Sequence, residues 1–146
     1  MKVSLPRSDF LLDRIKEALT PNRLPLLIAV DGADNAGKSS LASWLAWQLG
    51  MPAVQLDLYL TSLRPIQWLA EDLARVVACR LDRDRPLIID GVLVLDALNQ
   101  IGRTPNFVVF VSGGHRGSSL VSQIEAYQAR HRLPARADII IEGYTD

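Results

Sequence analysis

The sequence lacks several features that would define a protein class at once. It contains a single cysteine, Cys79, so neither an internal disulfide nor a cysteine metal cluster can form within the chain. The 16 basic and 16 acidic side chains give a formal net charge of zero. A general electrostatic surface for nucleic acid or for an anionic membrane is therefore missing, and we expect neither partner.

Long hydrophobic runs are also missing. No apolar stretch approaches the ~18 residues that a membrane-spanning helix needs, and residues 1–19 lack the apolar core of a signal peptide. We therefore expect a cytoplasmic protein. Hydrophobic residues make up 49% of the chain and charged residues 22%, which is typical of folded globular proteins. A length of 146 residues favours one domain, and we predict a single domain over residues 1–146.

Short apolar segments alternate with amphipathic segments along the whole chain. Strands are predicted at residues 24–30, 52–56, 86–90, 107–111 and 138–141. Helices are predicted from Ser8 or Asp9 to the residue before Pro21, and at residues 39–49, 66–81, 92–101 and 118–131. Because the strands are apolar on both sides, the pattern indicates an α/β fold, a five-stranded parallel sheet with helices on both faces.

A glycine-rich segment, DGADNAGKSS, follows the first predicted strand. Gly32, Gly37, Lys38 and Ser39 match the phosphate-loop pattern G-x-x-x-x-G-K-[ST]. Such a loop points backbone N–H groups at phosphate oxygens, aided by the following helix N-terminus. Lys38 would reach the β- and γ-phosphates, and the Ser39 hydroxyl would bind Mg²⁺. The motif predicts nucleoside triphosphate binding in a three-layer P-loop NTPase fold. The residues expected at the phosphates are Gly32, Ala33, Asp34, Asn35, Ala36, Gly37, Lys38, Ser39 and Ser40.

Acidic residues in and near this loop need separate roles. The Asp34 carboxylate would repel phosphate, so we expect it to point outward. A further acid is needed to hold Mg²⁺ through water, and Asp90 suits this role because it ends the strand at residues 86–90. Asp31, which ends the neighbouring strand, is the competing candidate. With Asp57 and Ser112, these acids are expected at the carboxyl ends of the strands, where such sheets bind ligands.

Four segments resemble the uridine kinase-like proteins, within the wider group of nucleoside and nucleotide kinases. They are IAVDGADNAGKSS (residues 28–40), VQLDLYLT (54–61), LIIDGVLVL (87–95) and ADIII (137–141). The guanine-reading Asn-Lys-x-Asp loop of GTPases is not found. The resemblance implies phosphoryl transfer from ATP to a hydroxyl of a small acceptor, a nucleoside or a similar metabolite. It implies that Asp57 is the base that accepts the hydroxyl proton, and it places Asp90 where the family usually has Glu.

The chain departs from this family in two segments. The family closes over ATP with an arginine-rich lid after the fourth strand, whereas this chain has SGGHRGS at residues 112–118. Arg116 is the expected phosphoryl-neutralising residue, with Arg130, Arg132 and Arg136 as alternatives or as a solvated face. Between Asp57 and the strand at 86–90 we expect room for one helix and little more. That leaves three alternatives open: a small acceptor, a homodimer that completes the site, or weak catalysis.

Two other functions remain open from the sequence. The reduced lid would suit an ATP-binding regulatory module with little catalysis. A kinase for a hydroxy acid would need an arginine for the acceptor carboxylate, and Arg64 is the candidate near Asp57. Among the aromatic residues, Tyr59 is a candidate for the acceptor pocket, and Trp68 is expected in the core of the helix at residues 66–81. Trp44 and Trp47 are expected to face the sheet or a partner.

Overall fold

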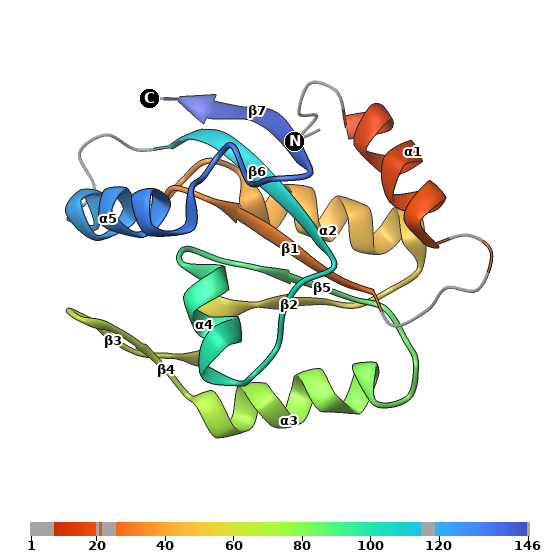
Figure 1. Ribbon diagram of the computed structural model, residues 1–146, viewed down its shortest axis with the longest axis horizontal. Helices are drawn as coiled ribbons and strands as arrows, with labels where there is room; N and C mark the ends of the chain where they lie inside the picture. The colour runs from red at the N-terminus through yellow and green to blue at the C-terminus, as the bar shows by residue number, and fades with distance from the viewer. Residues whose placement is uncertain (1–7, 20, 22–25, 115–118, 146) are drawn as a thin grey trace.

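The computed structural model describes residues 8–19, 21, 26–114 and 119–145, with side chains to residue 143 (Figure 1). Arg116 and the other residues between 114 and 119 lie outside the described part. The elements are α1 (Ser8–Leu19), β1 (Leu27–Gly32), α2 (Lys38–Leu49), β2 (Ala53–Gln55), the 3₁₀ helix η1 (Leu56–Tyr59), β3 (Leu60–Leu63), β4 (Ile66–Trp68), α3 (Ala70–Leu81), β5 (Leu87–Asp90), α4 (Val94–Gln100), β6 (Phe107–Gly114), α5 (Val121–His131) and β7 (Ile139–Thr145). No helix within these ranges is long and apolar enough to cross a membrane.

The main sheet confirms the predicted five-stranded parallel architecture. Its strand order is β2-β5-β1-β6-β7, and each neighbouring pair is parallel. In the centre of the sheet, Val30 of β1 is in register with Asp90 of β5, and Gln55 of β2 is also in register with Asp90. The carboxyl ends of these three strands therefore meet at one edge of the sheet, as the sequence predicted.

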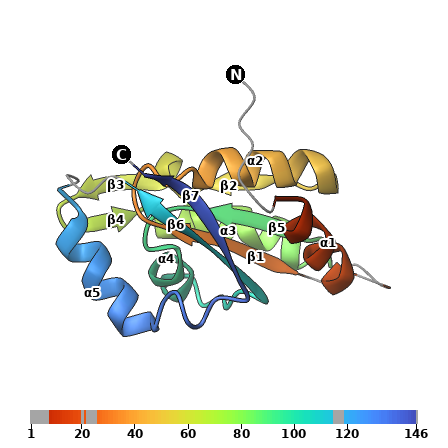
Figure 2. The same ribbon diagram turned by 90° about the horizontal axis from the view of Figure 1, so that it is seen from above.

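Helices cover both faces of the sheet (Figures 1 and 2). Helices α1 and α2 pack on one face against Ile28 and Val30, while α3, α4 and α5 pack on the other against Leu27 and Ala29. Alternate residues of β1 thus enter different cores, and all six residues of the strand are buried. This two-sided burial explains why the strand sequences are continuously apolar rather than alternating.

The helix predicted at residues 66–81 is shorter in the structure. Only Ala70–Leu81 is helical, and Ile66–Trp68 forms β4, which pairs with β3 as an antiparallel hairpin. The hairpin turn contains Arg64 and Pro65. The segment between Asp57 and β5 therefore holds a 3₁₀ helix and a hairpin in addition to α3, which is more than the sequence suggested.

The tryptophans fall into different environments. Trp68 is 9% exposed and packs in the core beneath α3, as expected, although it does so from a strand. On α2, Trp44 packs against the opposite core, whereas Trp47 is 78% exposed and points away from it. On α3, Leu73 and Val77 are buried, whereas Val76 is 37% exposed.

Candidate active site

The phosphate loop lies between β1 and α2, at the carboxyl edge of the sheet. Its two motif glycines have backbone conformations that other residues rarely adopt: φ is 149° at Gly32 and 98° at Gly37. A Cβ on Gly32 would lie 2.4 Å from the carbonyl oxygen of Val111, so the loop could not pass β6 with a larger residue. The loop opens into a cavity of about 300 Å³, which we call the phosphate cavity. It is lined by Asp34, Asn35, Gly37, Lys38, Ser39, Ser40, Asp57, Asp90, Gly91 and Val92.

Lys38 begins α2, and its side chain is 7% exposed. The Nζ atom donates a hydrogen bond of 2.5 Å to the carbonyl oxygen of Ala33, so the ammonium group is held against the loop itself. Burial lowers the pKa of Lys38, while the nearby carboxylates, led by Asp31 and Asp34, act in the opposite direction. The loop therefore carries a buried lysine at the place where the motif requires one.

Ser39 and Asp90 meet on the wall of the phosphate cavity. The Ser39 hydroxyl donates a hydrogen bond of 2.9 Å to Oδ1 of Asp90. Asp90 is 2% exposed, and burial raises its pKa to about 6, although the Ser39 hydrogen bond and Lys38 act against this rise. Among the described residues, Oδ2 of Asp90 is buried without a hydrogen-bond partner. A free carboxylate oxygen next to a hydroxyl is a donor set that suits Mg²⁺.

The residues around this pair define how a cation would be held. Within the described ranges, no cluster of three or more His, Cys, Asp or Glu side chains is arranged to bind a metal. Mg²⁺ commonly takes few protein ligands and completes its shell with phosphate oxygens and water. Ser39 and Asp90 fit that mode, in which the cation is bound together with a nucleotide.

Asp31 is engaged elsewhere. It is 1% exposed; its Oδ1 accepts the Gly32 backbone N–H at 2.8 Å, and its Oδ2 accepts the Tyr127 hydroxyl at 2.5 Å. Burial raises the pKa of Asp31 to about 6, and the hydrogen bond from Tyr127 opposes this rise. Asp31 does not line the phosphate cavity. Of the two candidate acids, Asp90 is thus the one beside Ser39.

A second, smaller cavity of about 200 Å³ adjoins the phosphate cavity; we call it the inner cavity. Asp34, Asp57 and Val92 line both cavities. Asp57 is exposed on η1, directly after β2, as expected for a residue at a strand end. Asp34 is half-buried at the junction, which corrects the expectation that it points outward. The remaining walls are largely apolar and come from Leu60, Leu63, Ile66, Trp68, Ser119 and Leu120.

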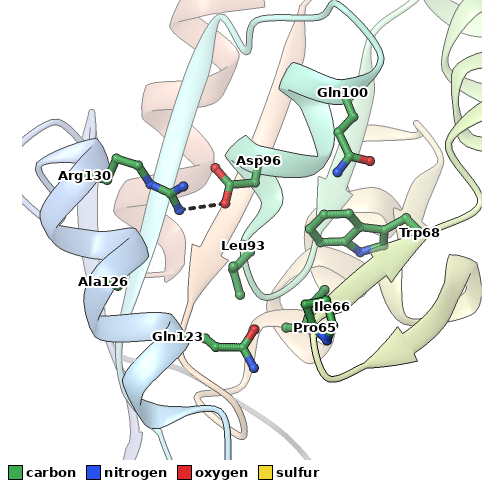
Figure 3. Close-up of a pocket in the computed structure, with 9 residues that line it drawn as sticks. All are labelled: Pro65, Ile66, Trp68, Leu93, Asp96, Gln100, Gln123, Ala126 and Arg130. Atoms are coloured by element: carbon green, nitrogen blue, oxygen red, sulfur yellow. Dashed lines mark hydrogen bonds and ion pairs between the residues drawn. The ribbon is translucent and has the colours of Figure 1, made fainter.

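A third cavity of about 690 Å³, the outer cavity, lies beyond the hairpin (Figure 3). Ile66 and Trp68 line it as well as the inner cavity, so the hairpin separates the two. On the opposite wall, Arg130 of α5 forms an ion pair of 2.8 Å with Asp96 of α4. Its remaining lining residues are Pro65, Leu93, Gln100, Gln123 and Ala126.

The basic residues proposed for the lid are not gathered at the phosphate cavity. Arg130 faces Asp96, and Arg132 and Arg136 are exposed in and after the C-terminal end of α5. None of these three lines the phosphate cavity. Arg64 and Tyr59 are not among the residues that line the inner cavity. Arg116 stays a prediction because it lies outside the described residues.

Tyr127 is the site residue that the sequence reasoning missed. Nothing in its spacing along the sequence marks it as a partner of Asp31. Its position at the centre of the amphipathic face of α5, beside Ile124, could have indicated burial. A buried tyrosine usually needs a hydrogen-bond partner for its hydroxyl, which was the available signal.

Comparison with solved structures finds proteins that resemble this chain in fold. A possible uridine kinase from Bacillus stearothermophilus superposes with a TM-score of 0.62 at 17% identity, over 93% of this chain and 97% of that chain. An uncharacterised protein from Eubacterium ventriosum gives 0.47 at 15% identity, over 80% of this chain and 87% of that chain. Shikimate kinase from Bacteroides thetaiotaomicron gives 0.43 at 19% identity, over 81% and 86%. No protein-family model and no curated protein sequence matches the chain.

The first of these superpositions covers nearly the whole of both chains. At 17% identity it establishes a shared fold, the α/β architecture with a five-stranded parallel sheet. This confirms the fold class expected from the order of the sequence segments. The phosphate loop, Ser39 and Asp90 then define the site by their own geometry.

Proposed function

We propose that the protein is an ATP- and Mg²⁺-dependent kinase that phosphorylates a hydroxyl of a small, uncharged acceptor, most simply a nucleoside. The observation that carries this proposal is the junction of two cavities. One holds the phosphate loop with Lys38, Ser39 and Asp90, and the other is a space lined by apolar side chains and carboxylates that shares Asp57 with the first. Phosphoryl transfer requires such an arrangement, because the attacking hydroxyl and the terminal phosphate must meet in line.

Each residue has a role that follows from its position. When bound, Mg²⁺-ATP supplies the phosphoryl group and the neutralising cation. The loop amides and Lys38 bind and orient the phosphates, for which Lys38 exchanges its hydrogen bond to Ala33 for a phosphate oxygen. Ser39 and Asp90 hold the cation and its water. Asp57 accepts the proton of the acceptor hydroxyl at the boundary between the cavities.

The lining of the inner cavity favours an uncharged acceptor. Its described lining residues include two carboxylates, Asp34 and Asp57, and no basic side chain. An acceptor carboxylate would be repelled there, because no arginine or lysine of the described lining compensates its charge. The apolar side chains of the hairpin suit a ring or another largely apolar body. A nucleoside therefore fits this lining better than a hydroxy acid does.

A regulatory module remains the second candidate, and one observation favours it. The inner cavity, at about 200 Å³, is smaller than the roughly 300–1,000 Å³ of most small-molecule sites. Under this alternative the protein binds ATP and changes its affinity for a partner, with slow hydrolysis only.

The deciding experiment measures ADP release from Mg²⁺-ATP against a panel of nucleosides, deoxynucleosides and small hydroxy acids. We expect one nucleoside to stimulate release, Lys38→Ala to abolish it, and Asp57→Asn to abolish it while ATP binding persists. Asp72→Asn, an exposed aspartate on α3, serves as the matched control. Tight ATP binding without stimulation by any acceptor would favour the regulatory module. Stimulation by hydroxy acids alone would overturn the uncharged acceptor.

A further inference from the structure

A buried hydrogen-bonded chain connects the phosphate loop to α5. Gly32 is the first residue of the loop, and its N–H donates to Oδ1 of Asp31. The other oxygen of Asp31 accepts the Tyr127 hydroxyl at 2.5 Å, from a residue 96 positions away in the sequence. Both side chains are 1% exposed. The first peptide of the loop is thus held by a side chain, and that side chain is held by a distant helix.

Tyr127 is itself fixed on two sides. Its hydroxyl donates to Asp31 and accepts the backbone N–H of Leu95, at the start of α4, at 3.0 Å. Its ring lies 4.7 Å from the ring of His131, one turn further along α5. His131 in turn pairs with Asp96 through a contact of 2.7 Å. The hydroxyl position is therefore defined by α4 and α5 together.

Burying a carboxylate and a hydroxyl in a core costs free energy that apolar side chains would not. Burial disfavours the charged form of Asp31 and raises its pKa to about 6. Tyr127 packs among apolar side chains such as Ile124 and Leu98, where a phenylalanine would need no partner. Replacing a buried polar pair with apolar residues is often neutral or stabilising, so packing alone gives no reason for the pair. The pair instead fixes the positions of its groups, because a buried network whose hydrogen bonds are all made holds its members in one arrangement.

The group whose position matters for nucleotide binding is the Gly32 peptide. Gly32 has a φ of 149° and passes close to β6, so its peptide plane sets the direction of the amides that follow. Asp31 does not line the phosphate cavity and would not touch a phosphate. Its contribution to binding would therefore be made through Gly32 and not through direct contact.

We propose that Tyr127 is a positioning residue of the phosphate loop, which acts through Asp31 to fix the Gly32 peptide and so sets nucleotide affinity. The proposal rests on the nucleotide binding proposed above. It links the loop to the segment around α5, because Leu120, immediately before α5, lines the inner cavity. The residue that precedes α5 thus lines the inner cavity, while Tyr127 within the helix anchors the start of the loop.

The test uses Tyr127→Phe, which removes one hydroxyl and keeps the ring. Asp31 then loses a donor in the core, and the Gly32 peptide is no longer fixed. We expect the Kd for Mg²⁺-ATP and for inorganic tripolyphosphate to rise about 10-fold by calorimetry, the effect of one lost buried hydrogen bond. We also expect faster hydrogen exchange of the Gly32 amide. In turnover, KM for ATP should rise about as much, and kcat at saturating ATP should change little.

Three further variants make the result specific. Ile124→Val shortens a neighbouring core residue on α5 without touching Asp31, and it should leave nucleotide affinity unchanged although it lowers stability. Asp31→Asn should weaken binding by itself. In the double variant, Tyr127→Phe should add no further loss, because it acts through Asp31. All variants are compared at a temperature where circular dichroism shows them fully folded.

The experiments distinguish failure of the positioning role from failure of the proposed function. If Tyr127→Phe lowers stability but leaves the Kd within about two-fold and Gly32 exchange unchanged, the tyrosine is only structural and the proposal is overturned. Additive losses in the double variant would show that Tyr127 acts by a route other than Asp31. If the wild-type protein binds neither ATP nor tripolyphosphate, the proposed function fails; faster Gly32 exchange in Tyr127→Phe would still support the link itself.

Discussion

The Ser39 hydroxyl lies 2.9 Å from Oδ1 of Asp90, although the two residues are 51 positions apart in the sequence. Ser39 lies in the first turn of α2, directly after the phosphate loop, and Asp90 ends β5, the strand beside β1. Their contact brings the hydroxyl and the carboxylate expected at Mg²⁺ to one point. It also shows why Asp90, and not Asp31, is the acid that fits this role.

Disruption of this pair should change the Mg²⁺ dependence of nucleotide binding. We expect Asp90→Asn to weaken Mg²⁺-ATP by on the order of 10-fold or more, because an amide replaces the free anionic oxygen. Binding of ATP without Mg²⁺ should change far less. Ser39→Ala should act in the same direction, with a combined loss smaller than the sum. Calorimetry with and without Mg²⁺ measures the effect, and equal losses under both conditions would rule out the cation role.

Lys38→Ala should strongly weaken nucleotide binding without unfolding the protein. The ammonium group is the cation expected at the β- and γ-phosphates, so we expect a loss on the order of 100-fold in affinity. Unfolding in urea should show little loss of stability, because burial already disfavours the charged lysine. Lys16→Ala, on the exposed side of α1, is the matched control and should bind normally. Unchanged affinity in Lys38→Ala would contradict the phosphate-loop assignment.

Stability without ligand should depend on pH through Asp31 and Asp90. Burial raises both pKa values from 3.8 to about 6, so the folded state binds more protons than the unfolded state between these values. Their stabilising effect is complete below about pH 4 and is lost as pH rises through 6. We expect urea unfolding to give a free energy roughly 1–3 kcal/mol higher at pH 5 than at pH 7.5.

The matching control for this pH effect is the double variant Asp31→Asn with Asp90→Asn. It should show a flatter dependence over the same range, because neither position titrates. A wild-type protein that becomes steadily less stable from pH 7.5 to pH 5 would contradict the assigned shifts.

The hairpin should determine acceptor affinity, whereas its turn should not. Leu63 of β3 is 56% exposed and lines the inner cavity, so Leu63→Ser changes the cavity wall at little cost to folding. We expect the acceptor KM to rise several-fold, since apolar contact with the acceptor is lost. The adjacent Arg64→Ala should leave KM unchanged because Arg64 does not line the inner cavity. A raised KM for Arg64→Ala alone would favour an acidic acceptor instead.

Some of the fold could be predicted because its signals are local. The apolar runs and the intervening helical periodicity indicated a parallel sheet covered on both faces, and all five strands are present with shifted ends. The segment at residues 66–68 was assigned to a helix because Trp68 and Leu69 fit the helical spacing. It forms a strand because Leu60 and Leu63 pair with it across the turn, a contact that spacing along the chain does not encode.

The candidate site could likewise be predicted only in part from the sequence. The spacing of Gly32, Gly37, Lys38 and Ser39 determined the phosphate loop, because the motif needs only neighbouring residues and their backbone conformations. The choice between Asp31 and Asp90 required tertiary structure. Both end apolar strands, and only the packing of α5 shows that the Asp31 carboxylate is occupied by Tyr127. Hydrogen bonds between residues about 50 to 100 positions apart leave no period in a sequence, so only folding decided which acid lines the phosphate cavity.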